Sequence, residues 1–262
     1  RERVRKPHLG DGATDLAGRA ITHARTAEVP PMDLIEKPPL AVVIDLDDTL
    51  FPQGSFLYGA ARAVGRAGAA AGLDPIRLSR AVRRQLLAGS DRGGTIDRAL
   101  AAYGIAPDLA ADLIPLLVDA FTAYRPRRLP RYPGTLDALL AISSRFPVAC
   151  LTDGDPAIQR AKLAATGLAS SFTTVVITDE LGGRTLRKPH PEGLRQAAAT
   201  LGVHPSDLVV IGDRPTRDMA VAVALGARSI RVRTGEYFDA PDTPPPTAEA
   251  PDLPAAATLL GV

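Results

Sequence analysis

Short apolar runs, each linked to the next by a segment with a helical pattern, restrict the fold of this chain more than any other feature. The runs are rich in β-branched residues, which is typical of strands, and they are too short for buried helices. Strands that alternate with amphipathic helices predict a parallel sheet covered on both faces, and therefore an α/β fold. The runs are AVVID at 41–45, FPVACLT at 146–152, TTVVIT at 173–178, DLVVIGD at 207–213 and RSIRV at 228–232.

The intervening helices have readable ends. The segment 156–166 begins with Pro156, repeats apolar residues at helical spacing and is followed by Gly167, a suitable residue for a helix C-terminus. A similar pattern runs from Pro191 through Leu201 to Gly202. Both segments lie between consecutive apolar runs, as a βαβ arrangement requires.

One interval breaks this rhythm, because about a hundred residues separate the first two runs, whereas a single βαβ unit needs only about 30. Residues 53–131 are rich in Ala, Leu and Arg, and glycines interrupt their helical pattern. We expect an inserted helical domain there, with the segment 124–134 as its return hinge.

The two ends of the chain carry weaker patterns. Residues 1–38 have scattered charges and several prolines, and we expect an extension or linker with one short helix near 15–27. Residues 239–251 are proline-rich and predict a surface loop before a last short helix near 255–260.

Composition narrows the function classes. The chain has 262 residues, 45% hydrophobic content and a net charge of +2, so it predicts a folded protein with no sign of nucleic-acid binding. Its single cysteine excludes an internal disulfide framework and favours a reducing compartment, so we expect a cytoplasmic protein. No apolar run approaches the roughly 20 residues that span a bilayer, and we expect no membrane partner. The sequence leaves the oligomeric state open.

Three carboxylates follow the first apolar run. Asp45 and Asp47 are two residues apart, so they point the same way if the strand geometry continues, and Asp48 points away. In an open α/β sheet this end of the strand borders the ligand crevice. Two neighbouring carboxylates repel unless a cation joins them, and Mg²⁺ suits carboxylates and phosphate oxygens. The alternative is a capping turn in which the acids bind backbone donors.

Polar residues also follow three later runs. Thr152 and Asp153 end the second run, Lys188 lies in RKP after the third, and Asp213 and Asp218 follow the fourth. Each has a plain interpretation on its own: an ordinary turn, a solvated lysine, or a helix N-cap. Because the carboxyl ends of parallel strands meet at one edge, their recurrence in this order predicts a shared site.

The stretches DLDDTL, LTDG, RKP and GDRPTRD, in this order, resemble the four motifs of the haloacid dehalogenase-like superfamily. The resemblance covers about residues 40–233, and it is closest to phosphoglycolate phosphatase-like members. It implies a Rossmann-like three-layer α/β core formed by 39–52 and 132–262. The helical insertion 53–131 is then similar to the cap domain that acts as a lid in such enzymes.

The resemblance also implies roles for the polar residues. Asp45 is expected to attack phosphorus and form an aspartyl-phosphate, and Asp47 to serve as general acid and then general base. Thr152 and the N–H of Asp153 are expected to hold phosphoryl oxygens. Lys188 is expected to stabilise charge on the nucleophile and the phosphate.

By the same resemblance, Mg²⁺ is expected to bind Asp45, Asp213 and the main-chain carbonyl of Asp47. Asp218 is expected outside the metal's ligands, where it orients Lys188 or a metal-bound water. One position differs from the family pattern, because Asp153 stands where Asn is frequent, and a charged side chain in contact with substrate would alter preference.

Four functions stay open. Dehalogenating members lack a carboxylate at the position of Asp47, so this residue favours phosphoryl transfer and a phosphatase for a small phosphorylated metabolite. A sugar-phosphate mutase uses the same motifs and differs in how its cap excludes water. A phosphorylated signalling switch of the receiver type has similar residues, but the long insertion and the D-x-D spacing disfavour it. An accessory domain of a larger biosynthetic enzyme is the fourth reading.

Two residues of the insertion are candidates for substrate contact. Arg92 and Thr95 flank the glycines of SDRGGT and could reach the leaving group from the cap, while an exposed loop is the alternative. The chemical identity of the leaving group is not readable from the sequence. Sugar phosphates, phosphoglycolate and nucleoside monophosphates all fit.

Overall fold

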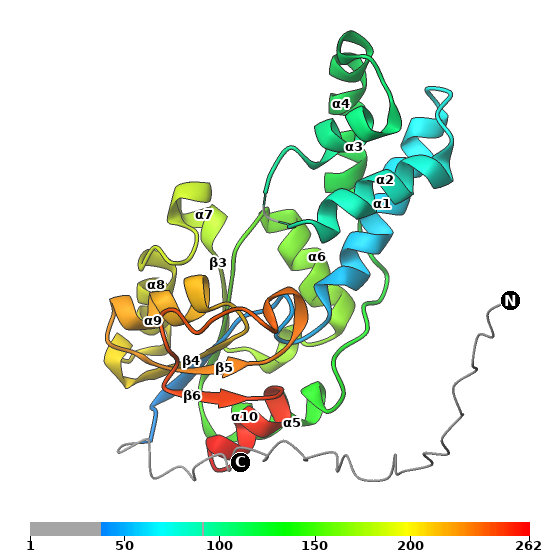
Figure 1. Cartoon of the computed structure of the whole chain (residues 1–262). Coiled ribbons are helices and arrows are strands. Elements are labelled where there is room, and N and C mark those ends of the chain that lie inside the picture. Colours follow the sequence, from blue (N-terminus) through cyan, green and yellow to red (C-terminus); the bar gives the residue numbers. More distant parts are fainter. Residues whose placement is uncertain (1–37, 91) are drawn as a thin grey trace, which may run out of the picture. The chain divides into compact units, whose positions relative to one another are not determined.

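The computed structural model describes residues 38–90 and 92–262, and within them the chain forms one parallel sheet of six strands (Figure 1). The predicted extension over 1–38, with its short helix, lies outside the described residues apart from Pro38. The strand order is β3-β2-β1-β4-β5-β6, so β1 lies in the interior of the sheet. The strands are β1 (Ala41–Ile44), β2 (Val148–Thr152), β3 (Thr174–Ile177), β4 (Leu208–Gly212), β5 (Arg228–Val232) and β6 (Ala248–Ala250). The predicted α/β fold with a parallel sheet is confirmed.

Alternation along β1 explains why two separate clusters flank the sheet. Val42 and Ile44 belong to a core cluster on one face, and Ala41 and Val43 belong to the cluster on the other. All four side chains are fully buried, as expected for a strand covered on both sides. The sheet is therefore the middle layer of three.

Helices complete the two outer layers. Residues of α5 (Thr135–Arg145), α6 (Pro156–Thr166) and α10 (Leu253–Leu259) pack in the first cluster, and residues of α8 (Glu192–Leu201) and α9 (Ala220–Ala224) pack in the second. The start of α6 follows from its sequence. Asp155 accepts a hydrogen bond from the amide of Ile158, Pro156 opens the first turn, and Gly167 ends the helix in a left-handed conformation.

Four helices lie between β1 and α5 and share a cluster of their own. They are α1 (Gln53–Ala69), α2 (Pro75–Leu87), α3 (Thr95–Tyr103) and α4 (Pro107–Thr122). Leu78, Leu100 and Leu117 are fully buried in this cluster. The first turns of α1 belong instead to the cluster beside the sheet, because Phe56 and Ala60 pack there. The helix α1 thus contributes residues to both clusters.

The structure differs from the sequence predictions at the C-terminal end. The segment predicted as a loop over 239–251 contains β6, which pairs with β5 from Ile230 to Val232. The last helix spans Leu253–Leu259 rather than 255–260. Several short elements were not predicted, among them the helix α7 (Thr178–Gly182) and a π-helical turn over Pro215–Met219. Within the described part of the chain, no helix has the length and apolar character needed to cross a bilayer.

Candidate active site

Asp45 extends β1 by one residue to the rim of the sheet. Its amide still bonds the carbonyl of Ile211 in β4 at 2.9 Å, and the residue is only 6% exposed. Lys188 reaches it from the segment after β3, with Nζ 2.6 Å from Asp45 Oδ1. The same ammonium lies 2.6 Å from Asp218 Oδ1 and 3.1 Å from the carbonyl of Leu151. The lysine is 3% exposed, so it is a buried cation held by two carboxylates.

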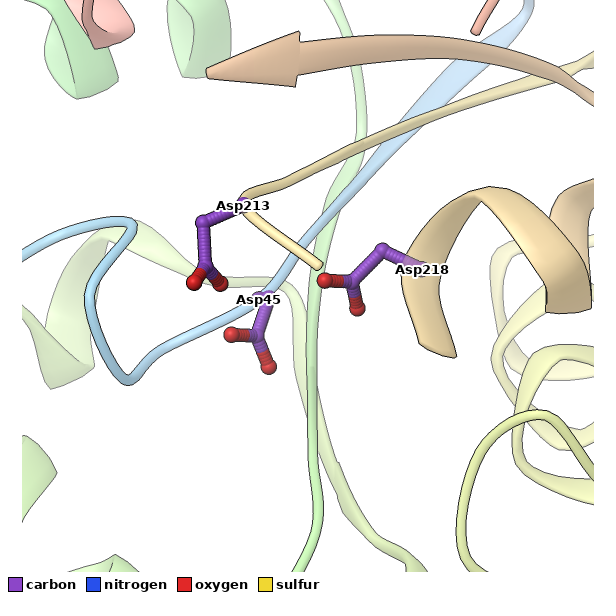
Figure 2. Close-up of side chains that lie close together, drawn as sticks. All are labelled: Asp45, Asp213 and Asp218. Carbon is purple, nitrogen blue, oxygen red and sulfur yellow. The ribbon is translucent and has the colours of Figure 1, made fainter. Parts of the chain in front are cut away.

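Three carboxylates converge at this point. Asp45, Asp213 and Asp218 each place an oxygen within 4.8 Å of the others. Figure 2 shows them gathered together, with Asp218 on the helical turn that follows β4. Asp218 fits because a glycine precedes Asp213. A Cβ at Gly212 would lie 2.3 Å from the carboxyl carbon of Asp218, so a larger residue would displace the acid.

Asp213 lacks the hydrogen-bonded partners that Asp45 and Asp218 have. Both of its carboxylate oxygens are buried and have no hydrogen-bond partner among the residues that the structure describes. Burial, and then the charges of Asp218, Asp45 and Asp48, raise the pKa of Asp213 well above its ordinary value. Burial raises the pKa of Asp45 to about 7, although the neighbouring Lys188 lowers it. One ammonium among three carboxylates leaves room for a hard cation with oxygen ligands, so these residues fit Mg²⁺.

Asp47 points away from this cluster and has partners of its own. Lys162 Nζ lies 2.7 and 2.9 Å from its two carboxylate oxygens, and Gln159 Nε2 lies 3.0 Å from Oδ2. Both partners come from α6 and are buried, Gln159 at 2% and Lys162 at 4% exposure. The sequence prediction missed them. Their spacing of three positions places both on one face of the helix, but the sequence alone does not show that this face is buried.

Thr152 and Asp153 lie at the tip of β2. The hydroxyl oxygen of Thr152 is 2.5 Å from Gln159 Nε2. The carboxylate of Asp153 accepts hydrogen bonds from the hydroxyl of Thr178 at 2.8 Å and from the amide of Lys188 at 3.0 Å. The charge introduced by Asp153 is therefore bound by groups of the core, which limits its influence on a substrate.

Asp48 has a structural part. Its backbone has φ 56°, a left-handed conformation that Asp tolerates better than most residues. Its carboxylate accepts hydrogen bonds from the amides of Gln53 at 2.9 Å and Glu236 at 3.1 Å. As expected from the alternation along the strand, it caps the following turn, and it also ties the start of α1 to the loop after β5.

A cavity of about 410 Å³ lies over these residues, between the end of the sheet and the inserted helices. Of the two candidates from the insertion, Thr95 lines it, together with apolar residues that include Phe56 and Phe121. Arg92 is not among the described residues that line this cavity. Its side chain is exposed and donates from Nη1 to the carbonyl of Ala88 at 3.1 Å, which closes its own loop. Contact of Arg92 with substrate stays a prediction, although its side chain does not line this cavity.

The site residues that the sequence predicted are thus divided into groups. Asp45, Lys188, Asp213 and Asp218 form one buried cluster, and Asp47 lies beside it with Thr152, linked by Gln159. All of these residues except Asp218 line the cavity. Asp218 is behind it, where its second oxygen accepts from the amide of Arg214 at 3.0 Å. An acid that accepts from a lysine and an amide is suited to hold them in place.

Comparison with known proteins finds relatives of this chain among phosphatases. A glyceraldehyde 3-phosphate phosphatase of Methanopyrus kandleri is 31% identical over 205 residues, which cover 76% of this chain and 86% of that protein. A phosphoglycolate phosphatase of Rhodospirillum rubrum is 36% identical over 197 residues, covering 72% and 77%. Among solved structures, the magnesium-bound HAD-hydrolase YfnB of Bacillus subtilis has a TM-score of 0.63 at 17% identity. The match covers 86% of this chain and all of that one, and it shows a shared fold. Residues 39–226 match the haloacid dehalogenase-like hydrolase family, and the chain belongs to that family.

Proposed function

We propose that this hydrolase is a Mg²⁺-dependent phosphatase that removes phosphate from a small phosphorylated metabolite through an aspartyl-phosphate at Asp45. One observation carries the proposal. The buried carboxylate of Asp45 pairs with Lys188 and opens onto a cavity of metabolite size. Beside it lies Asp213, whose carboxylate has no hydrogen-bond partner among the described residues. The phosphatases among its relatives support the same chemistry.

The donor set fits a magnesium ion. Asp45 and Asp213 would hold it together with the main-chain carbonyl of Asp47, and Asp218 would stay outside with Lys188 and the amide of Arg214. When bound, the ion supplies positive charge that offsets the repulsion between the nucleophilic carboxylate and the phosphate. The buried oxygens of Asp213, which have no hydrogen-bond partner among the described residues, support the binding of such an ion.

In the first step, an oxygen of Asp45 attacks phosphorus and the bond from phosphorus to the leaving oxygen breaks. Asp47 gives its proton to that oxygen, so the leaving group departs as an alcohol. The hydroxyl of Thr152 and the amide of Asp153 hold phosphoryl oxygens, and Lys188 stabilises the negative charge. The short contact between Lys188 and Asp45 places the cation where that charge develops.

In the second step, water attacks phosphorus of the aspartyl-phosphate and gives a proton to Asp47, which now acts as a base. The bond between phosphorus and the Asp45 oxygen breaks, which releases inorganic phosphate and restores the carboxylate. Each step needs the carboxyl group of Asp47 close to the oxygen that gains or loses the proton.

We further propose that residues 53–131 act as a cap over a core formed by 39–52 and 132–262. The cavity is lined from both parts, and the insertion contributes Phe56, Phe121 and Thr95 to it. Apolar groups on this side exclude water from the leaving group, which strengthens the electrostatic interactions beneath. Thr95 is the residue of the insertion proposed to contact the substrate.

A phosphate-release assay tests the function. The panel contains glyceraldehyde 3-phosphate, phosphoglycolate, phosphoserine, sugar phosphates and nucleoside monophosphates, each with Mg²⁺ and with a chelator. The proposal predicts release from at least one compound that requires Mg²⁺ and is lost in Asp45→Asn. Release that persists in Asp45→Asn contradicts the nucleophile. Isomerisation of a sugar phosphate without release identifies a mutase instead.

A further inference from the structure

Lys162 and Gln159 carry polar groups that the steps above do not use, although both line the cavity. A buried lysine is costly unless its charge is compensated, and the side chain of Lys162 is only 5% exposed. Its ammonium bonds both oxygens of a single carboxylate, that of Asp47, whose side chain is 18% exposed. So close a two-oxygen contact restricts the rotation of that carboxylate.

Gln159 is a second donor that restricts the orientation of the Asp47 carboxylate. Asp47 Oδ2 accepts from Gln159 Nε2 as well as from Lys162, so two donors approach from α6. The other three acids of the site lie in the separate cluster within 4.8 Å of one another, which Asp47 does not join. The donors from α6 therefore hold the carboxylate of Asp47 apart from the cluster of three acids.

Gln159 also orients the phosphate-binding hydroxyl. Its Nε2 lies 2.5 Å from the oxygen of Thr152, so that oxygen accepts a hydrogen bond from the amide. When Asp47 is ionised, as it is after it has given its proton to the leaving oxygen, its carboxylate only accepts hydrogen bonds, and this fixes the amide of Gln159 this way round. With its oxygen engaged as acceptor, the hydroxyl of Thr152 has its proton available for a phosphoryl oxygen.

Lys162 also contacts an aromatic residue at the base of the insertion. The ring of Phe56, on α1, lies 4.7 Å from Lys162 Nζ and is almost fully buried. A cation above an aromatic face gains electrostatic stabilisation, more so where water is excluded. Lys162 is thus held by Asp47 on the core and by Phe56 at the base of the insertion.

We propose that Lys162 and Gln159 are positioning residues for the general acid and base Asp47, and that Gln159 also orients Thr152. Lys162 offsets the negative charge that Asp47 gains when its proton passes to the leaving oxygen. This inference rests on the proposed phosphatase function and adds residues through which Asp47 acts.

The test compares leaving groups. An alkyl phosphate such as propyl phosphate needs a proton on its leaving oxygen, whereas p-nitrophenyl phosphate has a stable phenolate leaving group and needs little help. Since kcat/KM reports the first step, Lys162→Met lowers kcat/KM for the alkyl ester by roughly a hundredfold and for the aryl ester by less than about fivefold. For the aryl ester kcat and KM fall together, because the second step still needs Asp47 as base.

Matched variants separate this role from structural support. Arg160→Met removes a cation from the exposed side of the same helix, where Arg160 pairs with Glu180, and leaves both rates unchanged. Lys162→Arg keeps the charge and restores part of the alkyl rate. Gln159→Met lowers kcat/KM for both esters, because the orientation of Thr152 affects the phosphoryl group itself. Thermal unfolding of each variant confirms that it is folded under assay conditions.

A double-mutant cycle gives the decisive result. In an Asp47→Asn background, Lys162→Met changes the alkyl kcat/KM by less than about threefold, because the group on which it acts is already lost. Losses that multiply in the double variant, or equal losses on both esters in Lys162→Met, overturn the inference while leaving the phosphatase in place. Absence of release by the wild-type enzyme from both esters and from every compound of the metabolite panel refutes the proposed function, and the inference with it.

Discussion

The acidic cluster makes the stability of the metal-free protein depend on pH in an unusual direction. In the folded state, burial raises the pKa of Asp45 from 3.8 to about 7. Between about pH 4 and pH 7 the folded protein therefore binds a proton that the unfolded chain has released. The free energy of unfolding falls as the pH rises through this window, and the loss is complete above about pH 8. Asp213 shifts in the same direction and adds to the effect.

The size of the effect follows from linkage. A group with a folded pKa of about 7 contributes about 1.4 kcal/mol more to stability at pH 6 than at pH 8, if its unfolded pKa is near 4. For a chain of this size, 1.4 kcal/mol corresponds to a Tm change of about 3 to 6 °C. The carboxylates with lowered pKa values, Asp179 and Asp242, titrate below this window and do not contribute.

The assay is thermal unfolding at pH 6 and pH 8, with a chelator and with Mg²⁺. Without metal, the wild-type Tm is higher at pH 6, and in Asp45→Asn the difference shrinks by about 3 to 6 °C. This comparison cancels the pH dependence of all groups that the two proteins share. Mg²⁺ raises the Tm more at pH 8, because no proton must leave before it binds. An identical pH dependence in wild type and Asp45→Asn, or an equal Mg²⁺ shift at both pH values, would refute the reasoning.

Three further variants probe the cap, the cavity and the turn after β1. Leu117→Ala, at a fully buried position of the inserted helices, lowers the free energy of unfolding in urea by about 2 to 5 kcal/mol; a loss below about 1 kcal/mol would mean that this cluster is loosely packed. Arg92→Ala leaves kcat/KM within about twofold, whereas Thr95→Val raises KM, because Thr95 lines the cavity and Arg92 does not. The reverse pattern in steady-state kinetics would place Arg92 on the substrate. Asp48→Ala removes the hydrogen-bond acceptor of the Gln53 and Glu236 amides and lowers the free energy of unfolding by roughly 2 kcal/mol or more. Urea unfolding compares it with Asp48→Asn, which keeps an acceptor. Equal stabilities of the two variants would contradict this role.

Much of the fold was predictable because its signals are local. The strands β1 to β5 are short runs with β-branched residues between turn residues, and α6 carries its own cap, proline and terminal glycine. The acids at strand ends were predictable for a topological reason, since the carboxyl ends of parallel strands share one edge. Asp45, Lys188, Asp213 and Asp218 meet there, although they are far apart in the chain.

The features that the sequence did not reveal depend on partners distant in the chain. Ala248–Ala250 has little β propensity and forms β6 because β5 offers an open edge. Gln159 and Lys162 resemble ordinary polar residues of a surface helix until the fold brings α6 against Asp47. For Arg92 the sequence left open either a contact with substrate or an exposed loop, and the structure shows an exposed side chain that bonds the carbonyl of Ala88.

The covalent intermediate is the most direct test of the central claim. Rapid quenching of the enzyme with a ³²P-labelled substrate, followed by digestion and peptide mass analysis, locates any phosphoryl group on the chain. Our account predicts label on Asp45 that forms and decays at rates compatible with turnover, is absent in Asp45→Asn, and accumulates in Asp47→Asn with p-nitrophenyl phosphate. Label on another residue, or turnover at the full rate with no phosphorylated Asp45, would contradict it.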